Sequence, residues 1–98
     1  MSPRVVLHAP TPASLGRARS NARNLIAAEP AAQVEIVVNA GAAAAALTSA
    51  DAATDRFVLV CENSLKSSGL DGSGYRTIPA AIVHLARRQA DGWAYIRA

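Results

Sequence analysis

Cys61 is the only cysteine of the chain and the strongest nucleophile that the sequence offers. It directly follows the apolar run 57–60, Phe-Val-Leu-Val, and precedes a segment with the composition of a short helix, residues 62–68. A thiol at the start of a helix faces unpaired backbone N–H groups, which favour a negative charge. Because the thiolate is the reactive form of cysteine, this position predicts a nucleophile whose pKa is modestly lowered, with the charge of Glu62 acting against the effect.

The same spacing also fits a structural interpretation of Cys61. Cysteine is among the residue types most often buried as a small apolar side chain. Val60, just before it, belongs to the predicted core. Spacing by itself therefore leaves open whether Cys61 is a reactive thiol or an inert one.

Other polar or turn-forming residues come directly after predicted strands. His8 follows the run 5–7, Asn39 follows 34–38 and Pro79 follows 75–78. In an open parallel sheet, ligands bind beyond the carboxyl ends of the strands, so these residues and Cys61 are expected to gather at one edge. His8 is either a base for Cys61 or a hydrogen-bonded structural residue, and Asn39 either lines the site or forms the turn that asparagine tolerates.

Several classes of function lack their motifs in this chain. A cysteine-based phosphatase or a rhodanese-like anion loop has an arginine shortly after the cysteine, whereas here the next arginine is Arg76. The segment 39–41 is not GxGxxG, and no GxxxxGK[ST] occurs, so nucleotide binding has no support. A single cysteine excludes a disulfide within the chain, a CxxC pair and a multi-cysteine zinc site. No metal and no organic cofactor is expected.

Composition narrows the protein class further. The chain has 98 residues, of which 51% are hydrophobic and only 4% aromatic, so residues 1–98 are expected to form a single domain with a thin, alanine-rich core. We expect a homo-oligomer to supplement that core. The net charge of +3 comes from basic residues scattered over several elements, which argues against nucleic-acid binding. No apolar stretch is long enough for a signal peptide or a membrane span, so the cytoplasm is the expected compartment.

Strand and helix patterns alternate along the chain. The predicted strands are residues 5–7, 34–38, 57–60, 75–78 and 93–96, and the predicted helices are residues 13–28, 42–47, 62–68 and 80–90. The strands are nearly continuous apolar runs, which is typical of a parallel sheet covered on both faces. The sequence therefore predicts an α/β fold with three layers, α/β/α, around a mostly parallel five-stranded sheet.

Helical spacing also predicts which faces are buried. In the helix 13–28 the apolar stripe consists of Leu15, Ala18, Ala22, Leu25 and Ile26. In the helix 80–90 the predicted apolar stripe consists of Ile82, Val83, Leu85, Ala86, Gln89 and Ala90. His84 lies on the opposite side of that helix with Arg87, Arg88 and Asp91, where a solvated or intersubunit role is expected. Trp93 and Tyr95 are expected to pack in the core or between subunits.

Most of the chain resembles the DsrE/DsrF-like (YchN-like) family. The segments that carry this resemblance are 5–8 (Val-Val-Leu-His), 21–25 (Asn-Ala-Arg-Asn-Leu), 34–39 (Val-Glu-Ile-Val-Val-Asn), 61–65 (Cys-Glu-Asn-Ser-Leu) with Gly69-Leu70, and 79–96, which ends in Gly-Trp-Ala-Tyr-Ile. Its most specific parts are the segment around Cys61 and this C-terminal one. The chain is most similar to the short, uncharacterised members, and it has Ser67-Ser68 where relay members commonly carry arginines.

The resemblance implies a sulfur carrier. In the sulfur-relay members a cysteine after the third strand holds sulfane sulfur, and Cys61 occupies that position. As a cysteine-dependent sulfurtransferase the chain would take a persulfide on Cys61, stabilised by the N–H groups of Asn63 and Ser64, with His8 and Asn39 at the substrate site. The implied partners are further copies of the chain, as a trimer or hexamer, and a donor or acceptor that is a protein or a small thiol. The alternative is a non-catalytic oligomeric protein that binds a small ligand and has a structural cysteine.

Overall fold

Apolar runs of three to six residues form a parallel sheet in the computed structural model, which describes residues 2–98. The five strands are β1 (Arg4–Ala9), β2 (Gln33–Val38), β3 (Val58–Cys61), β4 (Arg76–Ile78) and β5 (Ala94–Arg97). They lie in the order β4-β3-β2-β1-β5, and every neighbouring pair is parallel. The predicted α/β fold with a five-stranded sheet is confirmed, and its boundaries differ from the predicted ones by one or two residues.

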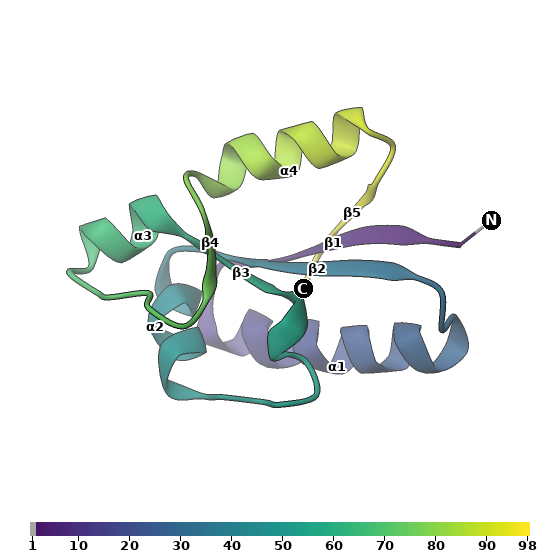
Figure 1. The fold of residues 1–98 in the computed structure, drawn as a ribbon, viewed down its shortest axis with the longest axis horizontal. Coiled ribbons are helices and arrows are strands. Elements are labelled where there is room, and N and C mark those ends of the chain that lie inside the picture. The colour runs from purple at the N-terminus through teal and green to yellow at the C-terminus, as the bar shows by residue number, and fades with distance from the viewer. Residues whose placement is uncertain (1) are drawn as a thin grey trace.

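Helices connect the strands and cover both faces of the sheet. They are α1 (Pro12–Ala28), α2 (Gly41–Thr48), α3 (Glu62–Ser67) and α4 (Ala81–Ala90), and a short 3-10 turn, η1 (Asp55–Phe57), leads into β3. Figure 1 shows α1 and α2 on one side of the sheet and α4 on the other, with α3 at the end where β3 finishes. The three layers of the prediction are therefore present, with a single helix forming the third.

Successive side chains of a strand point to opposite faces of the sheet, so the core consists of two clusters, one on each face. Val5, Leu7 and Ala9 of β1 pack toward α1, whose Leu15, Ala18 and Ala22 are buried as predicted. Val6 of β1 and Val37 of β2 face the other way and pack with Leu85 of α4. Because alanines fill much of the α1 and α2 contact surface, each helix approaches the sheet closely but buries little area.

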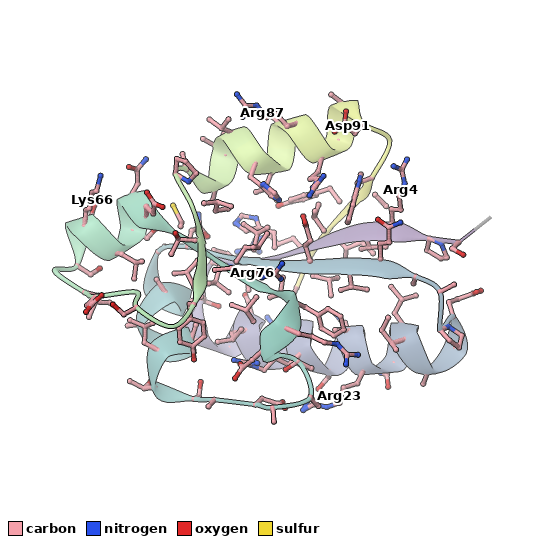
Figure 2. The ribbon with its side chains drawn as sticks, in the orientation of Figure 1. Arg4, Arg23, Lys66, Arg76, Arg87 and Asp91 are labelled. Atoms are coloured by element: carbon pink, nitrogen blue, oxygen red, sulfur yellow. The ribbon has the colours of Figure 1, made fainter. Side chains whose placement is uncertain are left out.

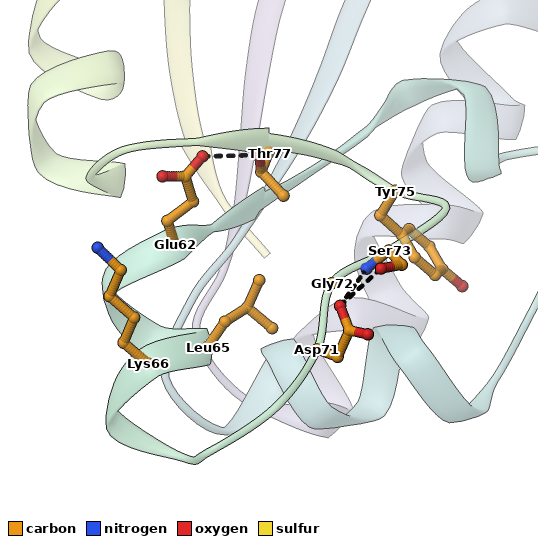
Figure 3. Close-up of a pocket in the computed structure, with 8 residues that line it drawn as sticks. All are labelled: Glu62, Leu65, Lys66, Asp71, Gly72, Ser73, Tyr75 and Thr77. Atoms are coloured by element: carbon orange, nitrogen blue, oxygen red, sulfur yellow. Dashed lines mark hydrogen bonds between the residues drawn. The ribbon is translucent and has the colours of Figure 1, made fainter.

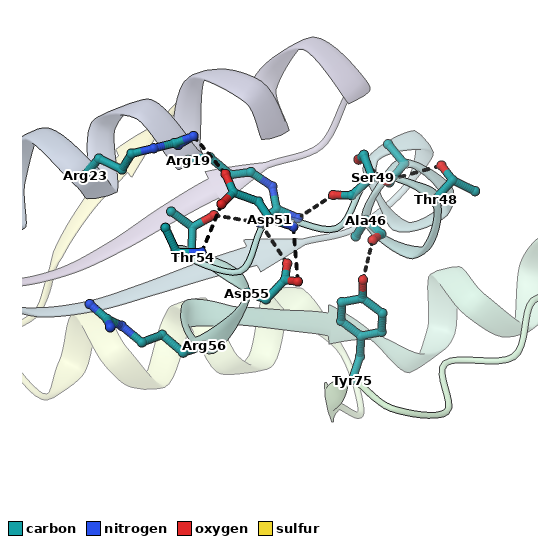
Figure 4. A network of polar contacts seen from close by, with 12 residues as sticks. Arg19, Arg23, Ala46, Thr48, Ser49, Asp51, Thr54, Asp55, Arg56 and Tyr75 are labelled. Carbon is teal, nitrogen blue, oxygen red and sulfur yellow. Dashed lines mark hydrogen bonds and ion pairs between the residues drawn. The ribbon is translucent and has the colours of Figure 1, made fainter.

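Arg19 of α1 is buried, although its position on the helix was expected to be outside the apolar stripe. Only 6% of Arg19 is exposed. Its guanidinium donates to the Thr54 hydroxyl at 2.7 Å, to the Asp55 carboxylate at 2.9 Å and to the Ser49 carbonyl at 3.1 Å. Figure 4 shows these groups meeting beneath the connection from α2 to η1. Two cations of α1, the buried Arg19 and the more exposed Arg23, therefore hold this connection to the helix.

Of the predicted apolar stripe of α4, only Leu85 is buried, and the rest of that prediction is wrong. Ile82 is 73% exposed and Val83 is 45% exposed, whereas Ala81 and Leu85 face the sheet. His84 and Arg88 also turn inward, because Glu35 of β2 lies beneath the helix. The Glu35 carboxylate accepts from His84 at 2.7 Å and from two Arg88 nitrogens at 3.0 and 2.7 Å. The half-buried Glu35 carboxylate needs hydrogen-bond donors, and this requirement fixes the orientation of α4. As a result, the aliphatic side chains of Ile82 and Val83 face away from the sheet.

The helix α3 ends at Ser67, one residue before the predicted end, and a glycine follows shortly after it. Gly69 has φ 64°, the left-handed conformation that glycine adopts without strain. The Leu70 N–H donates to the Leu65 carbonyl at 2.9 Å, and the half-buried Leu70 side chain packs on the core. This arrangement is the Schellman type of helix ending. It fixes the length of α3, and hence the position of its first turn beside Cys61.

The Arg19 network gives a stability prediction. Arg19→Ala removes the only cation that contacts Asp55 in residues 2–98 and leaves the Thr54 hydroxyl buried. We expect the free energy of unfolding, measured by urea denaturation, to fall by about 3 kcal/mol. The matched control is Arg23→Ala, which breaks the exposed pair between Arg23 and Asp51 and should cost at most about 1 kcal/mol. Equal losses in the two variants would contradict the assigned role of Arg19.

Candidate functional site

Cys61 lies where the carboxyl end of β3 meets the first turns of α3 and α4. It is the last residue of β3 and immediately precedes Glu62, the first residue of α3. Its sulfur accepts a hydrogen bond from the backbone N–H of Ala81, the first residue of α4, at 3.4 Å. Two helix N-termini therefore converge on one sulfur atom, and only 4% of the residue is exposed.

The surroundings of Cys61 favour its thiolate. Burial acts to raise the pKa of this thiol, because it removes water from the charged form. The nearby N–H and hydroxyl of Ser64, and then the N–H groups of Ala81 and Asn63, act in the opposite direction by favouring the charged form, and of these the Ala81 N–H forms a hydrogen bond to the sulfur. The result is a pKa of Cys61 below its ordinary value. The thiol is thus both buried and activated, a combination that neither sequence interpretation had described.

Ser64 is held in place by a neighbouring turn. Its hydroxyl oxygen accepts from the backbone N–H of Ala40 at 2.8 Å. With that oxygen occupied as an acceptor, the hydroxyl hydrogen remains available for Cys61. Ala40 itself has φ 49° and ψ −133°, in the left-handed region that L side chains rarely adopt. The Ala42 N–H closes the turn by donating to the Asn39 carbonyl at 3.1 Å.

His8 and Asn39 contact each other at the same edge of the sheet. The His8 Nε2 lies 2.9 Å from the Asn39 Oδ1, and the His8 Nδ1 lies 2.7 Å from the Tyr95 hydroxyl. Asn39 directly follows Val38, the β2 partner of Val60, so it continues the sheet register toward Cys61. The imidazole can keep both contacts in its neutral and its charged form, because the Tyr95 hydroxyl can either donate or accept.

All five residues selected from the sequence as site residues lie at the carboxyl edge of the sheet. His8 contacts Asn39, while Asn63 and Ser64 contribute to the hydrogen bonding of Cys61. No hydrogen bond joins His8 directly to Cys61 among residues 2–98. Sequence reasoning missed Ala81 and Tyr95, and it associated Pro79, two residues before Ala81, with the site. Pro79 was nonetheless the signal for Ala81, because proline commonly precedes or opens a helix.

A hollow beside α3 does not contain the thiol. It has a volume of about 410 Å³ and is lined by Glu62, Leu65, Lys66, Asp71, Gly72, Ser73, Tyr75 and Thr77. Figure 3 shows it between α3, β4 and the loop that joins them, with Glu62 accepting from Thr77 at 2.8 Å. Thr77 is the register partner of Val60, which faces α1 and α2, so the hollow lies on the face away from Cys61.

Residues 2–98 contain neither a metal-binding cluster nor a helix suited to crossing a membrane. Within this range no three His, Cys, Asp or Glu side chains are grouped as a metal-binding cluster. None of the helices in the same range combines the length and the apolar composition needed to cross a membrane.

Comparisons with known proteins support the fold. The solved structure of a protein of unknown function, MTH1491 from Methanobacterium thermoautotrophicum, matches with a TM-score of 0.77 and 28% sequence identity. The match covers 99% of this chain and 100% of that chain. No protein-family model and no curated protein matches the sequence. The architecture of this chain is thus one that a solved structure shares over its whole length.

The strained turn beside the site predicts a stabilising substitution. Ala40→Gly removes the steric cost of φ 49° without touching the N–H that donates to Ser64. We expect the free energy of unfolding to rise by about 1 kcal/mol in urea denaturation. The control is Ala44→Gly, an exposed position inside α2, which should lower stability by about 1 kcal/mol. Destabilisation by both substitutions would show that Ala40 is not strained.

The hydrogen bonds to Cys61 predict a pH effect. Ser64→Ala removes the hydroxyl donor and should raise the pKa of Cys61, measured by ultraviolet thiolate absorbance against Cys61→Ser as blank. Ser67→Ala, at the exposed end of the same helix, should leave the pKa unchanged. Since the pKa is depressed in the folded state, thiolate formation stabilises the wild-type fold at high pH. That contribution is lost as the pH falls through the folded pKa. A titration midpoint that Ser64→Ala does not move would contradict this role of the hydroxyl.

Proposed function

We propose that this protein is a sulfur carrier of the DsrE/DsrF-like kind, which accepts sulfane sulfur on Cys61 and passes it to a partner thiol. The proposal rests on the resemblance of the sequence and on one observation in particular. The sulfur of Cys61 accepts a hydrogen bond from the first turn of α4 and lies at the N-terminus of α3, and its pKa is lowered despite burial. Such an environment suits an anionic thiolate, and equally an anionic persulfide.

The transfer requires two thiol exchange steps and no external oxidant. The Cys61 thiolate attacks the outer sulfur of a donor persulfide, R–S–SH, and the S–S bond of the donor breaks. The donor leaves as a thiolate with the bonding electron pair, and Cys61 becomes Cys–S–SH. An acceptor thiolate then attacks the outer sulfur, and the Cys61 thiolate is the leaving group. The chain has no second cysteine, so the acceptor belongs to another molecule.

Access to the sulfur requires movement of the segment that covers it. Cys61 packs with Ile78 of β4 and with Ala81 of α4, and it is 4% exposed. Only two residues, the exposed Pro79 and the partly buried Ala80, separate Ile78 from Ala81. Displacing this turn would uncover the sulfur while β3 and α3 stay in place. We therefore assign sulfur exchange to an opened form.

A homo-oligomer, trimeric or hexameric, is part of the proposal. Large apolar side chains that a monomer leaves exposed are Ile82 and Val83 on α4 and Tyr95 and Ile96 on β5. Exposed apolar groups of this size are typical of surfaces that meet another protein. A reducing compartment such as the cytoplasm suits a carrier that must regenerate a free thiol.

The burial of Cys61 favours a second candidate function. A thiol with 4% exposure can be a structural residue, and the protein would then be an oligomeric binding protein without thiol chemistry. Both candidates share the fold and the exposed apolar side chains. They differ only in whether the sulfur of Cys61 ever reaches a donor.

Sulfur loading distinguishes these two candidates. The wild-type protein, incubated with a small-molecule persulfide and analysed by intact mass, should gain one sulfur atom that dithiothreitol removes. Cys61→Ser should gain none. Ser67→Ala, as a matched change in the same helix, should load like the wild type. The carrier function is rejected if the wild type gains no labile sulfur or if Cys61→Ser gains as much.

A further inference from the structure

A second hollow lies on the Cys61 face of the sheet, between α4 and the edge strand β4. Its volume is about 240 Å³, and it is lined by Ile78, Pro79, Ala80, Val83, His84 and Arg87. The register pairs Ile78 with Cys61, so their side chains lie next to each other on one face. Ala80 directly precedes Ala81, whose N–H donates to the cysteine sulfur. One short segment, 78–81, therefore forms the wall between this hollow and the thiol.

The charges around this hollow are mainly positive. Arg87 is exposed and forms no ion pair within residues 2–98, and Figure 2 shows its side chain extending from α4. The carboxylate behind His84 is Glu35, which is already bonded to His84 and to Arg88. No carboxylate side chain is among the residues that line the hollow. An anion at the mouth of the hollow would meet an arginine whose charge is not yet compensated.

The residues that line the hollow also indicate the size and the apolar part of the ligand. Ile78 and Val83 present aliphatic surface, and Pro79 adds an apolar ring. Binding pockets for drug-sized molecules have about 300–1,000 Å³. A hollow of about 240 Å³ therefore suits a smaller molecule with a short carbon chain. The lining combines a short apolar wall with one available guanidinium, which is the complement of a small organic anion.

We propose that this hollow binds the sulfur donor or acceptor of Cys61, and that this molecule is a small thiol bearing an anionic group such as a carboxylate. This inference rests on the proposed carrier function and specifies its substrate class. Arg87 pairs with the anion at the mouth, and Ile78 and Val83 contact the carbon chain. The sulfur end of the ligand lies against segment 78–81, and displacement of that segment brings the sulfur to Cys61. Neutral thiols lack the group that Arg87 recognises.

The test separates binding from chemistry. Cys61→Ser protein, which cannot exchange sulfur, is titrated with 3-mercaptopropionate and with the neutral 2-mercaptoethanol, while amide shifts are followed by NMR. The carboxylate thiol should give saturable shifts in segment 78–87, and the neutral thiol should give none. Adding Arg87→Met should weaken the binding of the carboxylate thiol about fivefold, which is the loss of affinity expected for one exposed ion pair. Arg17→Met, on the far face in α1, should change nothing.

Two results of the NMR titration would overturn the proposed ligand of the hollow. Absence of saturable shifts in segment 78–87, or an affinity that Arg87→Met leaves unchanged, overturns the assignment of the hollow. The second measurement is the rate at which each thiol removes sulfur from the Cys61 persulfide of the wild-type protein. The carboxylate thiol is expected to remove it several times faster than the neutral thiol. If Cys61 loads sulfur but both thiols unload it equally, only the substrate assignment fails. If Cys61 never loads, the carrier function fails, while the NMR titration still reports whether the hollow binds anions.

Discussion

The position of α4 depends on the Glu35 carboxylate. Glu35 faces α4 from the middle of β2, where burial acts to raise its pKa, but hydrogen bonds from Arg88 and His84 hold the pKa below its ordinary value. The charged carboxylate therefore requires both partners, which lie one helical turn apart on α4. Turning them inward brings Ala81 toward the sheet at the start of the helix and puts Ile82 outside. The N–H that reaches the Cys61 sulfur and the exposed apolar surface both result from this one ion pair cluster.

Much of the architecture could be predicted because the strands are apolar runs and the turns have distinctive residues. The five strands, the parallel order of connections and the glycine that ends α3 all follow from local patterns. The face of α4 could not be predicted in the same way. Helical periodicity predicts that Ile82 and Val83 are buried. It contains no information on the Glu35 carboxylate in β2, which needs hydrogen-bond donors from α4. A glutamate inside a strand, and a His and an Arg four residues apart in a helix, were the available signals.

The candidate site was predictable where neighbouring residues in sequence suffice. Asn63 and Ser64 lie in the first turn after Cys61, so their contribution follows from the helix start. His8 and Asn39 meet because parallel strands end at one edge. Ala81 and Tyr95 come from segments that close the fold later in the chain, and local patterns carry no information on those contacts. The strain at Ala40 was also hidden, since Gly41 next to it is the residue that would ordinarily take a positive φ.

Burial and activation of Cys61 are compatible because they come from different parts of the structure. The donors in α3 belong to residues that directly follow the cysteine, and they move with it. The covering groups, Ile78 and Ala81, belong to β4 and α4 and are separated by only two residues, Pro79 and Ala80. A movement of that turn removes the hydrogen bond from Ala81 and leaves the polar groups of Asn63 and Ser64 beside the sulfur. A thiolate could thus become accessible while most of the interactions that stabilise its charge remain in place.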